Sequence, residues 1–418
     1  MTHFTPLLAI AALLSAAPAF GQATAPPDDK PTITIYGTVV ANGSSAGSQL
    51  FIADIPGWAL AENQRLTPPA ISGQQPTGFD AGSATLFDAT ARQTRLGLRV
   101  AAPAGKSPWT PSGQIEVDFF GARPASSQGT VFNQPRLRLA LINLKHTSGW
   151  SFLAGQDWVI FAPTNPTSFA HYAVPLAASG GNPWMRLPQF RIEKLTKLSG
   201  SKGVLIQAGV LRPVSGGDSP AAGSLADAVE LSGERSGRPF VQGRVAMTGA
   251  AHGRAQSIGV SGHFGKEKAE PDTLNTWGVA LDGAVSIGSR IGLSGELWSG
   301  ENLDTFQAGI SQGVSLRQGH FSTVAAKGGW IQGSITLSPS ASINAGTGVD
   351  DPDDAALNGT LTRAKNQVTW INLMVRAHTS VTVAFEYNYF DTTHRAAARA
   401  DAHRGTGHYG NVAVVLSF

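Results

Sequence analysis

The stretch Val381–Tyr389, VTVAFEYNY, alternates apolar and polar side chains at every second position. Val381, Val383, Phe385, Tyr387 and Tyr389 fall on one face of an extended chain, and Thr382, Ala384, Glu386 and Asn388 fall on the other. A period of two is typical of a β-strand with one apolar and one hydrated face. This stretch therefore predicts a strand that separates an apolar environment from water.

The same pattern recurs along the chain after Pro31. It is found in Trp277–Val285, in Ile291–Leu297 and in Arg136–Leu141, where Leu137, Leu139 and Leu141 are expected to share the apolar face. No apolar stripe of helical period extends beyond two turns. We count about sixteen such segments, each about ten residues long, which is the length of a membrane-spanning strand.

The connections between these segments alternate in length. Short turns are expected at Ser148-Gly149, Gly288-Ser289 and Pro339-Ser340, and longer connections between them, such as 43–90, 160–187 and 265–275. Long loops at one end, short turns at the other and apolar side chains facing outward are typical of an outer-membrane barrel. The sequence predicts an all-β fold, an antiparallel transmembrane β-barrel over 32–418, with 16 strands and with 18 as the alternative.

Composition excludes several other classes. The 418 residues contain no cysteine, 14% charged residues and 49 glycines, and the formal net charge is +3. Without cysteine there is no disulfide scaffold and no thiolate metal site. The positive charges form no basic block, so nucleic acid is not an expected partner. We expect no cofactor.

No catalytic motif stands in its required context. Gly405, Gly407 and Gly410 match a dinucleotide-binding pattern, and 43–47 match a nucleophile elbow, but no helix is predicted after either. The chain is therefore not expected to be an enzyme.

The amino terminus predicts export. Residues Leu7–Leu14 form an apolar run that is followed by small residues, as in a cleaved signal peptide over 1–23. A short linker over 24–31 would then lead into the barrel. The expected location is the bacterial outer membrane.

The carboxyl terminus ends on an alternating strand. Val414, Leu416 and Phe418 lie on one face, and the chain ends at the aromatic residue. This arrangement resembles the signal that the barrel-insertion machinery reads. Aromatic residues near predicted strand ends are expected to form interfacial belts; they include Tyr36, Trp150, Trp158, Trp298, Tyr387 and Tyr389.

Several segments resemble trimeric general porins of Gram-negative bacteria. Residues 33–43 (ITIYGTVVANG), 91–100 (ARQTRLGLRV) and 136–158 (RLRLALINLKHTSGWSFLAGQDW) are similar to porin strands. Residues 113–121 (GQIEVDFFG) and 182–194 (NPWMRLPQFRIEK) resemble the DcaP-like branch, although the short linker replaces the helical extension of some DcaP-like proteins. The resemblance implies a homotrimer, a third outer loop folded into the lumen, and passive diffusion of small hydrophilic solutes. In the DcaP-like branch it implies a preference for anionic or dicarboxylate solutes.

Charged residues on the polar faces predict a preference for anions. Strand phase places Arg95, Arg99, Arg136, Arg138, Arg191, Glu116, Asp118 and Glu193 toward the lumen. The expected constriction loop, 160–187, contains His171 and Arg186 but no Asp or Glu. Excess positive charge in a narrow pore favours anions. The alternative is that these arginines pair with the carboxylates to brace the wall, and both interpretations can hold together.

Three further alternatives stay open. The chain could be a substrate-specific channel, a ligand-binding or adhesive barrel without general pore activity, or a secreted β-rich protein. Separately, Asp350, Asp351, Asp353 and Asp354 could hold a divalent cation or bridge through one to lipopolysaccharide. A hydrated loop tip is the competing interpretation of that acidic cluster.

Overall fold

The computed structural model describes residues 30–68, 73–103, 105–121, 133–215, 231–357, 362–395 and 403–418. The predicted signal peptide (1–23) and most of the predicted linker (24–31) lie outside the described residues. Within the described residues, no helix is long and apolar enough to cross a membrane.

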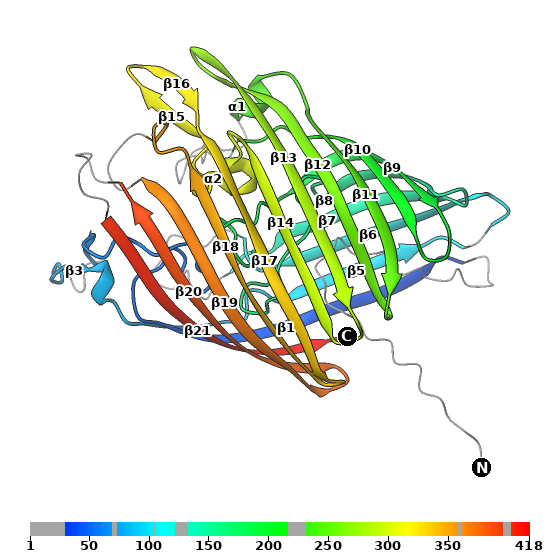
Figure 1. Cartoon of the computed structure of the whole chain (residues 1–418), viewed down its shortest axis with the longest axis horizontal. Helices are drawn as coiled ribbons and strands as arrows, with labels where there is room; N and C mark the ends of the chain where they lie inside the picture. Colours follow the sequence, from blue (N-terminus) through cyan, green and yellow to red (C-terminus); the bar gives the residue numbers. More distant parts are fainter. Residues whose placement is uncertain are drawn as a thin grey trace.

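The described chain forms one antiparallel sheet that curves into a barrel (Figure 1). The wall strands are β1 (Thr32–Ala46), β4 (Leu86–Thr90), β5 (Arg95–Ala101), β6 (Trp109–Asp118), β7 (Arg136–His146), β8 (Trp150–Trp158), β9 (Arg186–Lys197), β10 (Gly203–Leu211), β11 (Phe240–Ala251), β12 (Arg254–Ala269), β13 (Asp272–Ile287), β14 (Ile291–Glu301), β17 (Ala325–Ser338), β18 (Ala341–Pro352), β19 (Arg363–His378), β20 (Val381–His394) and β21 (His403–Ser417). The shorter elements lie in connections and are β2 (Arg65–Leu66), β3 (Phe79–Asp80), η1 (Ala81–Ser83), α1 (Ser232–Arg235), η3 (Asp304–Phe306), α2 (Ala308–Ser311), β15 (Val314–Arg317) and β16 (His320–Thr323).

Strand β1 closes the barrel. It pairs with β21 along one edge, and along the other edge it pairs with β5 and then β4. Because β4 and β5 are consecutive pieces of one wall position, the barrel has 16 strands. The predicted all-β barrel and its strand number are confirmed.

The alternation that predicted the strands also sets their orientation. In β20, Phe385 and Tyr387 are 48% and 44% exposed on the outer face, whereas Glu386 and Asn388 are 5% and 0% exposed inside. An apolar exterior around a polar interior is the reverse of a soluble barrel. It is the arrangement that a hydrocarbon surrounding requires.

The expected phase of β7 is wrong beyond Arg138. The β6–β7 register shifts by one residue, with Glu116 opposite Leu139 and Val117 opposite Leu137. Such a β-bulge moves all later side chains to the opposite face. Leu139 and Leu141 therefore point inward and are buried, while Ile142 takes the outer position.

Three aromatic side chains expected in the interfacial belts lie inside the barrel. The Tyr36 hydroxyl donates to the inward carboxylate of Glu116 at 3.1 Å. Trp298 is buried, and its Nε1–H donates to the Gly181 carbonyl at 2.9 Å. Trp158 lines an internal cavity. Nearness to a strand end did not decide their direction; the alternation did, because Ile33 and Ile35 take the outer positions beside Tyr36.

The long and short connections gather at opposite ends of the barrel, as Figure 1 shows for the β15–β16 hairpin and the β17–β18 turn. One expected long connection is wrong: β12 and β13 continue through most of 265–275 and leave only residues 270–271 between them. The strands there extend beyond the membrane-spanning length.

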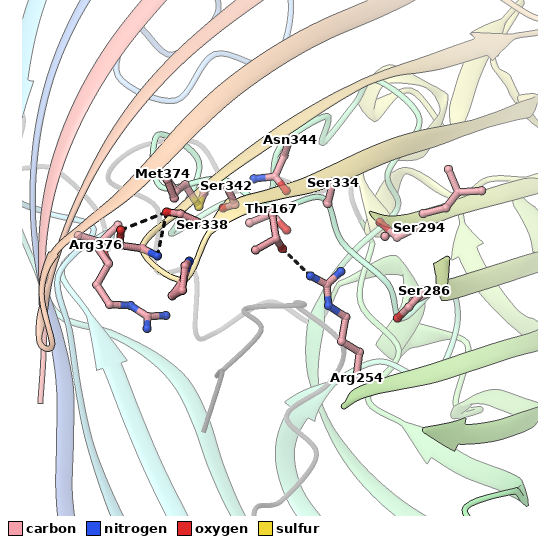
Figure 2. Close-up of a pocket in the computed structure, with 18 of the residues that line it drawn as sticks. Thr167, Arg254, Ser286, Ser294, Ser334, Ser338, Ser342, Asn344, Met374 and Arg376 are labelled. Carbon is pink, nitrogen blue, oxygen red and sulfur yellow. Dashed lines mark hydrogen bonds between the residues drawn. The ribbon is translucent and has the colours of Figure 1, made fainter. Parts of the chain in front are cut away.

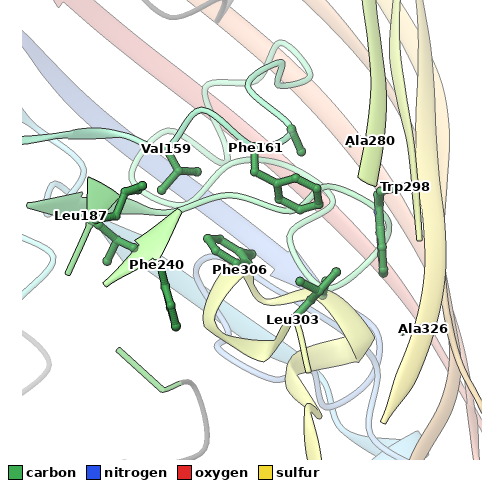
Figure 3. Close-up of a cluster of buried hydrophobic side chains, with 12 residues drawn as sticks. Val159, Phe161, Leu187, Phe240, Ala280, Trp298, Leu303, Phe306 and Ala326 are labelled. Carbon is green, nitrogen blue, oxygen red and sulfur yellow. The ribbon is translucent and has the colours of Figure 1, made fainter. Parts of the chain in front are cut away.

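Connections fold back into the barrel and form apolar clusters. Figure 3 shows Phe161 from the β8–β9 connection packed with Phe240 of the wall and with Phe306 and Leu303 of the β14–β17 connection. A second cluster joins Leu50 of the β1–β4 connection to Leu176 and to the wall. These contacts place apolar side chains of the long connections inside the barrel.

Candidate functional site

Residues 159–185, between β8 and β9, run along the inner wall. Their backbone N–H groups donate to wall side chains in chain order: Ile160 to Gln242 at 2.8 Å, Ala162 to Ser261 at 3.2 Å, Thr164 to Glu296 at 2.5 Å and Thr167 to Gln332 at 3.0 Å. The acceptors stand on β11, β12, β14 and β17 in turn. A buried segment without helix or sheet must find partners for its backbone, and here the wall supplies them.

The segment continues around the remaining wall. Asn372 of β19 donates to the Thr167 carbonyl at 2.8 Å, and Asn42 of β1 donates to the Phe169 carbonyl at 3.1 Å. Gln93, between β4 and β5, accepts the N–H groups of Tyr172 and Ala173 at 2.7 and 2.8 Å. The segment thus contacts much of the circumference of the barrel.

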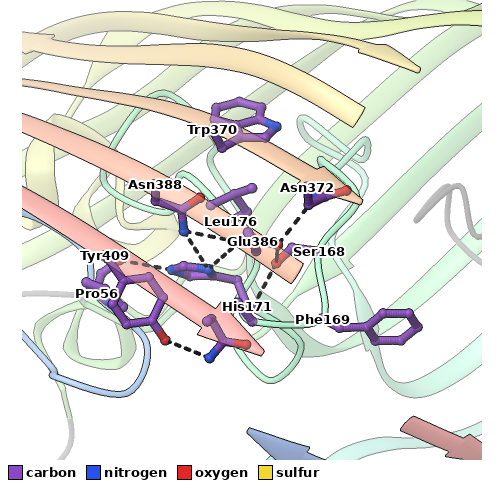
Figure 4. A network of polar contacts seen from close by, with 12 residues as sticks. Pro56, Ser168, Phe169, His171, Leu176, Trp370, Asn372, Glu386, Asn388 and Tyr409 are labelled. Carbon is purple, nitrogen blue, oxygen red and sulfur yellow. Dashed lines mark hydrogen bonds and ion pairs between the residues drawn. The ribbon is translucent and has the colours of Figure 1, made fainter. Parts of the chain in front are cut away.

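His171 lies in a polar network that joins two connections to the wall (Figure 4). Its ring nitrogens lie 3.4 Å from Glu386 Oε1 and 3.2 Å from the Pro56 carbonyl oxygen. Ser168 donates to Glu386 Oε2 at 2.6 Å. The side chain of His171 is buried among these partners, so it fixes the segment and has little exposure to the lumen.

Two inward arginines of β7 are paired. Arg138 contacts Glu116 at 2.7 Å and Asp118 at 2.9 Å, and Arg136 contacts Asp118 at 2.6 Å. Arg136 and Arg138 also donate to the Ala173 carbonyl. This group braces the wall and holds the inner segment.

Arg191 forms a second paired group on the neighbouring strands. It contacts Asp157 at 2.8 Å and Glu193 at 2.9 Å. The bracing interpretation therefore describes Arg136, Arg138 and Arg191.

Three of the other inward arginines, Arg95, Arg99 and Arg186, differ, because they have no ion pair with any residue in the described ranges. The Arg95 guanidinium lies 3.5 Å above the Tyr172 ring, and its Nη2 donates to the Tyr172 carbonyl. Arg99 lies 4.0 Å above the Tyr36 ring. Arg186 lies near the rings of two tryptophans and has a buried Nη1 without an acceptor among the described residues. Aromatic faces attract these cations without neutralising them.

A cavity of about 330 Å³ lies between the arginine-bearing wall and the inner segment. Arg95, Arg99, Arg138 and Glu116 line it, together with His171. A second cavity lies toward the short-turn end, and the two share Thr167, Phe169 and Met374. Figure 2 shows this second cavity, with Arg254 and Arg376 among serine side chains.

The acidic cluster is arranged differently from the expected loop tip. Asp350 is buried in β18, where its Oδ2 accepts the Ile310 N–H at 3.0 Å. Asp351 is the next strand residue, and Asp353 and Asp354 stand in the turn that follows. Within the described ranges, no three His, Asp or Glu side chains lie where they could hold a metal ion together.

The last strand matches its expected orientation. Val414, Leu416 and Phe418 are exposed on the outer face. The Gly37 N–H donates to the Phe418 carbonyl at 3.0 Å, and the Phe418 N–H donates to the Gly37 carbonyl at 3.1 Å. The chain end therefore completes the seam of the barrel.

Several site residues were not singled out from the sequence. They are Gln93, Gln242, Glu296, Gln332 and Glu386, which hold the inner segment, and Arg254 and Arg376 of the second cavity. Their positions on the polar faces of strands were the available signal for most of them. Their contacts with residues 159–185 join residues that are at least 79 positions apart in the chain, such as Gln93 with Tyr172, so no local pattern predicts them.

The chain resembles several solved structures. No family model and no curated protein sequence matches the chain. The outer membrane channel DcaP of Acinetobacter baumannii aligns with a TM-score of 0.67 and 18% identity, over 93% of this chain and 97% of that one. The anion-selective porin from Comamonas acidovorans aligns at 0.56 and 13%, over 93% and 100%. OmpF of Salmonella typhi, in complex with daunomycin, aligns at 0.54 and 12%, over 93% and 98%.

These likenesses establish a fold. The chain has the barrel of Gram-negative outer-membrane porins.

Proposed function

We propose that the protein is an outer-membrane porin that lets small hydrophilic solutes diffuse passively and favours anions. The proposal rests on the charge along the two neighbouring cavities. Four arginines line these cavities and have no ion pair with any residue in the described ranges: Arg95, Arg99, Arg254 and Arg376. The carboxylate in the lining, Glu116, is paired with Arg138. Uncompensated positive charge in a confined lumen raises the local concentration of anions.

The paired arginines support this role indirectly. Carboxylates pair with three of the arginines, Arg136, Arg138 and Arg191. Because their charges are compensated, these arginines contribute little net charge to the lumen. They position the wall and the inner segment, and the unpaired arginines then face the remaining space. Bracing and selectivity are thus divided between two sets of residues.

The test is a reversal-potential measurement on purified protein in a planar bilayer with a potassium chloride gradient. A potential of the anion-selective sign is expected. A potential of the cation-selective sign would reject the anion preference. The absence of conductance from a barrel shown to be folded would reject the porin proposal and favour a ligand-binding or adhesive role.

A substrate-specific channel is the second candidate. It is favoured by the apolar packing of connections inside the barrel, around Phe161, Leu303 and Phe306. A general porin passes ions with conductance proportional to salt. A specific channel instead shows saturable block of that conductance by its solute, and the same bilayer recordings discriminate the two.

The proposal includes a homotrimer inserted in the bacterial outer membrane, facing its lipid and lipopolysaccharide. The apolar exterior supports membrane insertion, and a similar structure is a trimer form of OmpT of Vibrio cholerae, with a TM-score of 0.50 and 9% identity. Cross-linking in detergent should give a trimer. Conductance should then appear in groups of three equal steps.

A further inference from the structure

The second cavity has a wall of hydroxyl groups. Ser286 of β13, Ser294 of β14, Ser334 and Thr336 of β17, Ser342 of β18 and Thr382 of β20 all line it. Thr336 and Ser342 are direct neighbours across β17 and β18, and Ser334 is opposite Gly292 of β14. Figure 2 shows the labelled serines along one side of the cavity.

Most of these hydroxyls are available to a solute. Those of Ser286, Ser294 and Ser342 have no hydrogen bond with any residue that the structure describes. Thr336 accepts a hydrogen bond from Arg254 at 2.5 Å, which leaves its own O–H free to donate elsewhere. A hydroxyl both donates and accepts, so this wall can exchange its water for the hydroxyls of a solute.

Two arginines stand at the hydroxyl wall, Arg254 at its edge and Arg376 within it, opposite Thr382. Arg254 belongs to β12, next to β13, and Arg376 belongs to β19, next to β18. Neither has an ion pair with a described residue, and no Asp or Glu is among the residues that line this cavity. An anionic group in the cavity would therefore meet a positive charge at two places on the wall.

We propose that the lumen favours small polyhydroxylated anions, such as sugar acids, over anions of the same size and charge that lack hydroxyls. The carboxylate or phosphate contacts Arg254 or Arg376, and the hydroxyls of the solute replace water on the serine and threonine wall. This inference rests on the proposed porin function and specifies its solute class.

The charged group and the hydroxyl-bearing chain of such a solute need different partners at the same time. An arginine binds the anionic end with geometric specificity. Neighbouring strands lie about 4.8 Å apart, so hydroxyls on consecutive strands can contact successive parts of a short chain. An alkyl chain of equal length would displace the same water without replacing its hydrogen bonds, and its passage is therefore disfavoured.

The experiment compares gluconate with hexanoate, two six-carbon monocarboxylates, by reversal potential in the same bilayer. The recordings compare the purified wild-type protein with a triple variant that carries S294A, S334A and S342A. The control variant is T369A, which removes a hydroxyl from the outer face of β19.

In the wild type we expect gluconate to permeate better than hexanoate, relative to their mobilities in water. The triple variant should lower the gluconate-to-hexanoate ratio about fivefold, the effect of one net hydrogen bond.

The outcomes separate this inference from the porin function. If the ratio does not change while chloride remains favoured over potassium, the hydroxyl wall is not selective and only this inference fails. If permeation of both acids rises equally, the serines act through pore width, and the inference also fails. Cation selectivity in the wild type would overturn the proposed function together with this solute class. Strand content measured by circular dichroism shows whether the barrels of T369A and of the triple variant are folded.

Discussion

The Thr164 N–H lies 2.5 Å from Glu296 Oε1, inside the barrel, and joins the inner segment to the middle of β14. Glu296 also accepts the indole N–H of Trp330 at 3.3 Å. This carboxylate therefore holds the inner segment at a point more than 130 residues away in the chain.

Replacing Glu296 with alanine should free this part of the segment. The change leaves the buried Thr164 N–H without this acceptor, which weakens the attachment of the segment by about 2 kcal/mol. We expect noisier and larger single-channel conductance, together with faster proteolytic cleavage within 159–185. The matched control, E296Q, keeps an acceptor oxygen and should remain close to the wild type. Equal behaviour of both variants would show that Glu296 does not hold the segment.

Much of the fold could be predicted because alternation is a local property. In Val381–Tyr389 the pattern alone defines the strand and its two faces. The alternation fails to predict the direction of Leu139 and Leu141, because a β-bulge depends on the pairing with strand β6. Glu116 and Val117 are neighbours in β6 but lie opposite Leu139 and Leu137, so the register shifts by one residue there. The direction of Tyr36 could have been predicted from Ile33 and Ile35, but its aromatic character suggested an interfacial belt.

The site was less predictable than the fold. Strand phase placed Arg95, Arg99 and Arg138 inside, yet it could not show which of them would be paired. His171 contacts Glu386, 215 residues away, and no local pattern connects the two. Pairing between distant strands depends on the closed barrel, and it determines which charges are left for a solute.

Arg138 should be important for stability more than for selectivity. It is buried, and its removal leaves Glu116 and part of the Asp118 charge without compensation. Breaking a buried ion pair in this way costs about 3 kcal/mol. R138M should lower the urea concentration at which the barrel unfolds in detergent. In the double variant R138M and E116Q, part of that loss should be recovered, because the uncompensated carboxylate is gone. Strictly additive effects would contradict a direct coupling between the two side chains.

Arg99 should show the opposite balance. It stacks on Tyr36 without an ion pair to any described residue, so R99Q removes a lumen charge and leaves the ionic network intact. The anion-to-cation permeability ratio should fall, while the unfolding midpoint stays near that of the wild type. R65Q, at an exposed pair with Asp80 in the β2–β3 hairpin, is the control and should leave the ratio unchanged. An unchanged ratio in R99Q would remove Arg99 from the selectivity proposal.

Salt concentration should tune the selectivity of the wild type. Fixed charges act over the Debye length, which is about 10 Å at 0.1 M salt and about 3 Å at 1 M. The anion-to-cation ratio should therefore move toward the value set by ion mobility as potassium chloride is raised between these concentrations. A ratio independent of salt would indicate selection by pore shape or by direct binding, and not by the field of the lumen arginines.

Gly37 and Phe418 should separate barrel closure from barrel insertion. Gly37 and Phe418 are joined by two backbone hydrogen bonds. A Cβ added at Gly37 would lie 2.6 Å from the Phe418 ring and 2.8 Å from the Arg95 carbonyl oxygen. The ring can rotate away but the backbone oxygen cannot, so G37A should destabilise the seam by about 2 kcal/mol. Adding F418A to G37A should give little rescue, because the clash with Arg95 persists.

F418A alone keeps the backbone hydrogen bonds, and it should fold normally in detergent. If Phe418 is the residue that the insertion machinery reads, the same variant should accumulate in cells as uninserted protein. Normal insertion of F418A in cells would show that the signal does not depend on this ring.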